Sequence, residues 1–245
     1  MVTLTEAQDK TILLIATSGF IAIDPKNKLV VLSFRGSHSN QNWIEDFKIA
    51  LICSDLCPTC RVHHGFWESW TGMRDMIIPN VLAATKAHPH YRFIVTGHSL
   101  GAAIATLAAA DIRKRNKWLH ENTELYTFGS PRVGSVATAD FLSKQSKKNY
   151  RITATADPVP RAPPPLFGYM HMSPEYWISR NGEDPKAEDV HVLTGYYNEQ
   201  GNTGTDFKTF EDHRKYFEYI TKCDPDPPSD PDKKAWWRFI VEGIL

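Results

Sequence analysis

The residues Gly97-His98-Ser99-Leu100-Gly101 place a serine between two glycines, and a serine hydroxyl becomes a nucleophile when a base removes its proton. An apolar run at 91–95 precedes them and an alanine-rich run at 102–110 follows, which predicts a strand, a sharp turn and a helix. The glycines lack the Cβ atoms that would clash in such a turn, so the backbone can hold the serine in a strained, exposed position. This context favours a nucleophile over an ordinary glycine turn.

A nucleophilic serine needs a base, and the base works best when a carboxylate orients it. Asp157 is the candidate acid because it closes an apolar run at 150–156 immediately before Pro158. Catalytic groups of parallel sheets gather at the carboxyl ends of the strands. The alternative is that Asp157 is only a turn residue before proline.

Three histidines follow Asp157 and are candidates for the base. His213 lies between a polar loop at 198–206 and a run that we interpret as a short aromatic helix, and a mobile base suits that position. His171 is the second candidate. His191 lies in the strand-like run Val190-His191-Val192-Leu193, which predicts a buried structural histidine. His98 is expected to project away from the hydroxyl and to have a packing or supporting role.

The elements that position these residues alternate between strands and helices. A hairpin is predicted at 19–24 and 28–34, and a helix over 66–87 with a kink at Pro79. Beyond them we expect strands at 91–96, 124–129 and 150–156 and helices at 99–116 and 136–147. This order predicts an α/β fold with a largely parallel sheet that helices cover on both faces.

Composition excludes several classes of protein. The 245 residues suffice for one domain with a sizeable core, and Lys+Arg and Asp+Glu number 28 each, so no basic surface points to nucleic acid. No apolar run approaches the length of about 18 residues that spans a bilayer. The start MVTLTEAQDK carries acidic residues where a signal peptide would be positively charged, so we expect no signal peptide in this chain.

Cys57-Pro58-Thr59-Cys60 could be a redox pair, half of a zinc site or a small disulfide. We favour the disulfide because no second cysteine pair completes a zinc site and the residues after Cys60 do not open a helix. A disulfide implies an oxidising compartment.

The composition changes after Cys223, so we divide the chain into a domain at 1–223 and a tail at 224–245. The tail begins with a stiff acidic linker at 224–232 and ends in the apolar run 235–245. That run predicts an anchor at a lipid surface or, alternatively, a segment packed on the domain.

Several motifs together resemble the fungal class 3 lipases of the Rhizomucor and Thermomyces type. They are Phe34-Arg35-Gly36-Ser37 with Asn42-Trp43-Ile44, the pentapeptide around Ser99, Phe128-Gly129-Ser130-Pro131-Arg132-Val133-Gly134, Asp157-Pro158-Val159-Pro160-Arg161, Ser173-Pro174-Glu175-Tyr176-Trp177 and Asp212-His213. The resemblance implies an α/β-hydrolase fold with a central, mostly parallel sheet and no metal or cofactor. It implies Ser99 as nucleophile, Asp157 as acid and His213, rather than His171, as base.

The resemblance also implies an oxyanion hole formed by Ser37 and Leu100, where two donors face the charge that develops on the substrate carbonyl. It identifies the segment from Ser39 to Phe47 as a lid. In that segment Trp43, Ile44 and Phe47 form one apolar stripe on a short helix, and Asn42 precedes them. Such a lid hides its apolar face in water and offers it to a lipid surface.

The chain departs from the family's pattern at both ends. We expect it to lack the family's N-terminal segment with its helix and secretion signal. Cys223 is similar to a cysteine that pairs within that segment, so here it is either free or paired with Cys53.

By resemblance we expect a secreted, extracellular hydrolase that cleaves acylglycerol esters through a Ser99 acyl-enzyme at an oil–water interface. Peripheral contact with a membrane or lipid droplet fits that expectation. The alternatives in chemistry are a feruloyl or aryl esterase and a phospholipase A1. The alternative of another class is an inactive, truncated lipase-like protein that binds lipid or a protein partner.

Overall fold

The structure is a computed structural model that describes residues 3–7, 10–15, 19–36, 49–180, 185–206 and 210–220. Several expectations fall on other residues and stay untested: Ser37, the lid with Asn42, Trp43, Ile44 and Phe47, the pairing of Cys223, and the tail at 224–245.

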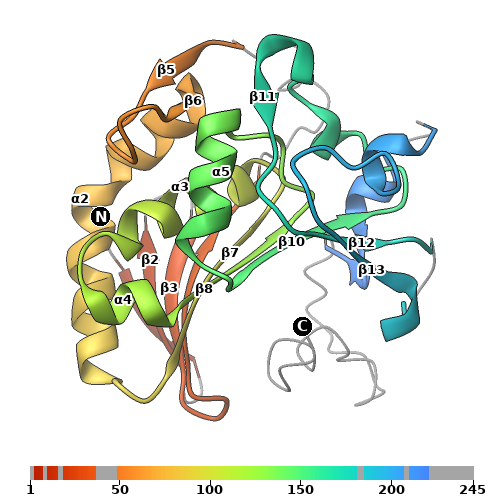
Figure 1. Cartoon of the computed structure of the whole chain (residues 1–245). Coiled ribbons are helices and arrows are strands. Elements are labelled where there is room, and N and C mark those ends of the chain that lie inside the picture. The colour runs from red at the N-terminus through yellow and green to blue at the C-terminus, as the bar shows by residue number, and fades with distance from the viewer. Residues whose placement is uncertain are drawn as a thin grey trace.

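The main sheet has nine strands within the described residues, in the order β1-β2-β3-β4-β7-β8-β10-β12-β13. Their bounds are Thr3–Ala7, Lys10–Ile15, Gly19–Asp24, Leu29–Phe34, Arg92–His98, Thr123–Phe128, Asn149–Ala154, Glu175–Ile178 and Val190–Leu193. The strands from β4 to β12 pair in parallel, and the strands outside them pair antiparallel. The predicted α/β class and the mostly parallel sheet are confirmed (Figure 1).

Helices connect the parallel strands, as the alternating pattern predicts. They are α2 (His64–Ala87), α3 (Leu100–Arg113), α4 (Lys117–Asn122) and α5 (Val136–Gln145). α2 is one continuous helix that contains Pro79, over nearly the range that the sequence predicts. Two small sheets complete the fold: β11-β9-β6-β5 (Tyr169–Met170, Gly134–Ser135, Arg61–His63, Leu51–Cys53) and β14-β15 (Lys215–Tyr216, Glu218–Tyr219).

Two hydrophobic clusters hold the sheet in place. The first joins α2, α3 and α5 to residues such as Val30, Phe93 and Leu125, and alanines let α3 approach the strands closely. The second uses neighbouring positions on the same strands, such as Leu29 and Ile94, which point to the opposite face because strand side chains alternate. The hairpin β14-β15 contributes Tyr216 to this second cluster. The segment that carries His213 therefore packs directly against the sheet.

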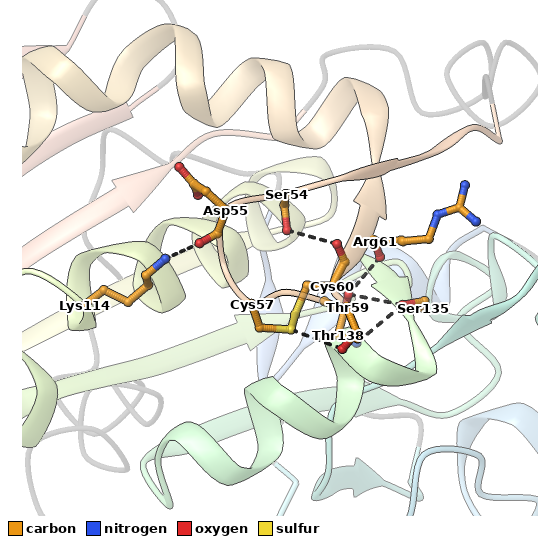
Figure 2. Close-up of a disulfide and its surroundings, with 9 residues drawn as sticks. All are labelled: Ser54, Asp55, Cys57, Thr59, Cys60, Arg61, Lys114, Ser135 and Thr138. Atoms are coloured by element: carbon orange, nitrogen blue, oxygen red, sulfur yellow. Dashed lines mark hydrogen bonds between the residues drawn. A yellow bond between two sulfur atoms is a disulfide. The ribbon is translucent and has the colours of Figure 1, made fainter.

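The disulfide between Cys57 and Cys60 confirms the expectation from sequence, with an S–S distance of 2.07 Å. Figure 2 shows it at the tip of the β5-β6 hairpin. Lys114, directly after α3, donates to the carbonyl oxygen of Asp55, and Thr138 of α5 donates to that of Arg61 at 2.8 Å. The hairpin is thus fixed to two helices.

The described residues hold no group of three His, Cys, Asp or Glu side chains that could bind a metal ion. Among the helices in the same part of the chain, none is both long and apolar enough to cross a membrane.

Candidate active site

Ser99 occupies the turn between β7 and α3, as the sequence predicts, with a φ of 59° and a ψ of −128°. The two glycines of the motif are required because other main-chain atoms pass too close to leave room for a Cβ atom. A Cβ atom at Gly97 would lie 2.4 Å from the carbonyl carbon of Gly101, and one at Gly101 would lie 2.3 Å from the carbonyl oxygen of Phe34. Backbone crowding therefore explains both glycines of the motif.

The side chain of Ser99 is enclosed, since the residue is 2% exposed. Its Oγ has no hydrogen-bond partner within the described part of the chain. The backbone at Gly36 passes close by, because a Cβ there would lie 3.3 Å from the Cβ of Ser99. Leu100 is the first residue of α3, where backbone N–H groups have no acceptor inside the helix. A backbone N–H without an acceptor inside the helix therefore directly follows Ser99 in the chain.

Asp157 and His213 form a buried pair. Nδ1 of His213 lies 2.9 Å from Oδ2 of Asp157, and both side chains are 0% exposed. Because a carboxylate accepts, Nδ1 carries the proton and Nε2 presents a lone pair. Nε2 is buried without a hydrogen-bond partner in the described residues. This is the tautomer that a general base needs.

Asp157 follows β10, the position that the sequence predicts. Its Oδ1 accepts from the backbone N–H of Val159 at 2.9 Å, and its Oδ2 also accepts from the hydroxyl of Tyr216. Both carboxylate oxygens are therefore bonded, which fixes the plane of the group facing His213.

Gly129, at the end of β8, makes room for this arrangement. Its φ is 59°, and a Cβ there would lie 2.8 Å from Oδ2 of Asp157, 2.9 Å from the hydroxyl of Tyr216 and 3.0 Å from Cε1 of His213. A side chain at this position would displace all three groups.

His98 packs on His213, with ring centroids 4.4 Å apart. Its Nε2 donates to the backbone oxygen of His213 at 2.8 Å. Burial, followed by the proximity of His213, lowers the pKa of His98 to about 4, so the ring stays neutral near pH 7. A supporting role beside the candidate base agrees with the expectation from sequence.

The other two histidines do not pair with Asp157. His171 is buried and donates from Nε2 to the carbonyl oxygen of Pro160 at 2.7 Å. Burial, with the charges of Arg151 and Arg132, places its pKa well below 6.5. The expectation of a buried His191 is wrong: the residue is exposed and contacts Ser179, because β13 is the edge strand of the sheet.

Tyr216 is the residue of the site that the sequence does not reveal. The aromatic helix expected after His213 is instead a 3-10 turn at Asp212–Arg214 followed by the β14-β15 hairpin. This hairpin buries Tyr216, and burial followed by the nearby Asp157 raises its pKa well above 10. The hydroxyl therefore keeps its proton and serves as a donor. Its place three positions after His213 is the only signal, and that signal is weak.

The chain matches the family model described as Lipase (class 3) over residues 31–167. It is 42% identical over 209 residues to the secreted mono- and diacylglycerol lipase A of Penicillium cyclopium, a match that covers 85% of this chain and 67% of that protein. It is 41% identical over 208 residues to the secreted mono- and diacylglycerol lipase 1 of Fusarium solani, covering 84% of this chain and 61% of that protein.

A solved structure has a similar fold over most of the chain. The mono- and diacylglycerol lipase from Aspergillus oryzae superposes with a TM-score of 0.79 at 39% identity, covering 86% of this chain and 81% of that one. Sequence and fold thus lead to the same family, and the chain belongs to the class 3 lipases.

Proposed function

We propose that the chain is a serine hydrolase of acylglycerol esters in which Ser99 is the nucleophile, His213 the base and Asp157 the acid. The observation that carries the proposal is the buried His213–Asp157 pair. Within the described residues, neither Nε2 of His213 nor Oγ of the strained Ser99 has a hydrogen-bond partner. Membership of the class 3 lipases supports the same reaction.

In the first step Oγ of Ser99 attacks the ester carbonyl carbon and its proton passes to Nε2 of His213. The leaving alcohol then takes that proton as its bond to the acyl carbon breaks, which leaves an acyl-enzyme. Water repeats the sequence: it loses a proton to Nε2, attacks the acyl carbon and releases the fatty acid, and the proton returns to Oγ. Asp157 stabilises the imidazolium in both steps.

The backbone N–H of Leu100 is one of two donors that we propose for the oxyanion hole, and Ser37 is the other. Leu100 directly follows the nucleophile and begins α3, so its N–H has no helical acceptor. Each donor of this kind contributes roughly 3–4 kcal/mol to the transition state.

The substrate class comes from the relatives. Those from Penicillium cyclopium and Fusarium solani are named secreted mono- and diacylglycerol lipases, and we propose mono- and diacylglycerols and an extracellular location for this chain. With Ser99 only 2% exposed, a lipid chain needs an opening step, and the lid that contains Asn42, Trp43, Ile44 and Phe47 would supply it.

An apolar protrusion supports contact with an oil–water interface. Leu166 is 89% exposed and Phe167 is 50% exposed. They precede β11, whose Tyr169 donates to the carbonyl oxygen of Ala50, just after the lid segment. An exposed apolar tip of this kind is suited to a lipid surface or droplet.

The central test replaces the nucleophile and the base separately. We expect Ser99→Ala and His213→Ala to lower kcat on a soluble short-chain nitrophenyl ester by at least about 10⁴-fold. The exposed His191→Ala is the matched control and should retain full activity. Full turnover by Ser99→Ala or His213→Ala would refute the proposal.

A second test concerns the interface. We expect Leu166→Ser with Phe167→Ser to weaken hydrolysis of an emulsified diacylglycerol and to leave the soluble ester unaffected. Val192→Ser is the control, because Val192 is 57% exposed on the edge strand β13. Equal losses on both substrates would contradict the interfacial role.

A further inference from the structure

The turn that carries Asp157 contains a strained residue. Thr155 has a φ of 33°, a region that β-branched residues rarely adopt. Such a conformation persists only where the surroundings hold it in place, and it often lies at a functional site. The contacts of the Thr155–Asp157 turn therefore show what holds the candidate acid.

Asn202 makes the contact that spans this turn. Its Nδ2 donates to the carbonyl oxygen of Asp157 at 2.9 Å and to that of Thr155 at 3.2 Å. The residue is 1% exposed and begins the 3-10 turn Asn202–Gly204. Because carbonyl oxygens only accept, the amide must present its NH₂ group to them.

Two other side chains donate to the backbone carbonyl groups of the turn, and both bond to its first residue. Nε1 of Trp177 donates to the carbonyl oxygen of Thr155 at 3.1 Å, and Oγ1 of Thr205 does so at 3.3 Å. Among these three donors, Asn202 alone bonds to the backbone of Asp157. Its amide therefore links the strained residue directly to the acid.

Asn202 is itself anchored on both sides. Its backbone oxygen accepts from Arg161 at 2.9 Å, and its backbone N–H bonds to the carboxylate of Glu175. Glu175 forms a buried ion pair with Arg151 at 3.4 Å, with both side chains 3% exposed. Burial alone would raise the pKa of Glu175, but Arg151 and these hydrogen bonds hold it below 4.5, so the anchor stays charged.

We propose that Asn202 is a positioning residue for Asp157, an inference that rests on the proposed function. Its amide ties the backbone of the acid to the Arg151–Glu175 pair, and through it the carboxylate keeps the place from which it orients His213. Asn202 thus serves the reaction without touching the substrate.

A double-mutant cycle tests this. We expect Asn202→Ala to lower kcat on a soluble ester by about 10²-fold, with KM little changed, because a small displacement of a catalytic group has that effect. In an Asp157→Ala background the same substitution should cost less than about twofold, since residues that act as a unit are not additive. Circular dichroism and urea denaturation of each variant give the fraction of folded protein, by which kcat is normalised.

Asn198 is the matched control, since its Nδ2 donates to Glu175 at 3.1 Å, whereas the Nδ2 of Asn202 donates to the carbonyl oxygens of the turn. Asn198→Ala should retain kcat within about twofold of the parent. An equal loss for Asn202→Ala in both backgrounds, per folded molecule, would overturn the inference, as would an equal loss in Asn198→Ala. Undiminished activity of Asp157→Ala alone would instead refute the proposed function.

Discussion

Backbone atoms hold Ser99, whereas side chains from distant parts of the sequence hold Asp157 and His213. Around Ser99 the close contacts lie between main-chain segments at Gly97, Gly101 and Phe34. Asp157 bonds instead to side chains 56 and 59 positions away. The nucleophile is thus part of the fold itself, and the acid and base are assembled by contacts that can change one at a time.

The largest effect is expected from a substitution that crowds the main-chain contacts around Ser99. Gly97→Ala adds a Cβ 2.4 Å from main-chain atoms of Gly101, which cannot move without separating β7 from α3. We expect the free energy of unfolding to fall by about 4 kcal/mol or more, measured by urea denaturation. Gly72→Ala in α2 is the control, because its Cβ would contact nothing within 4 Å. Similar urea midpoints for both variants would show that the elbow tolerates crowding.

Gly129→Ala, beside the acid and the base, should lower activity more than stability. Its Cβ would meet side-chain atoms of Asp157, Tyr216 and His213, which can shift. We expect kcat/KM on a soluble ester to fall about 10²-fold. Gly168→Ala shares the positive φ, at 83°, but its nearest contact is a flexible leucine at 3.7 Å, so activity should persist. Equal activities in the two variants would mean that backbone strain, rather than crowding, decides the outcome.

Tyr216→Phe removes one donor from Asp157 and keeps the ring in the second cluster. We expect kcat to fall about 10-fold, because a hydrogen bond to a charged group contributes roughly 1.5–3 kcal/mol. The half-buried Tyr176→Phe serves as the reference for losing a hydroxyl elsewhere in that cluster. An unchanged kcat would show that the two remaining hydrogen bonds suffice to place the acid.

The burial of Tyr216 beside Asp157 should also make the free energy of unfolding depend on pH in alkaline solution. The pKa of Tyr216 is raised well above 10, first by burial and then by Asp157. Above about pH 10 the unfolded chain loses this proton and the folded chain keeps it, so stability falls by up to about 1.4 kcal/mol per pH unit. Urea denaturation between about pH 10 and 11 should show a shallower decline in Tyr216→Phe. Parallel declines would place the effect in other tyrosines.

The same contrast explains what the sequence can predict. The elbow, the strands from β7 to β10 and the position of Asp157 are encoded locally, in glycine spacing and in apolar runs that end at a polar residue. Tyr216 and Asn202 depend on contacts between loops 45 or more positions apart, and no periodicity marks them. The burial of His191 was predicted wrongly because local pattern cannot distinguish an edge strand from a central one.

The Cys57–Cys60 bridge joins residues only three positions apart, and that spacing limits what it contributes. A crosslink stabilises mainly by restricting the unfolded chain, and for so small a ring the loss of chain entropy amounts to about 2 kcal/mol. Native domains are stable by about 5–15 kcal/mol, so reduction of this bridge alone leaves most of that margin in place. During production in a reducing host, the bridge therefore governs the shape of one turn more than the yield of folded protein.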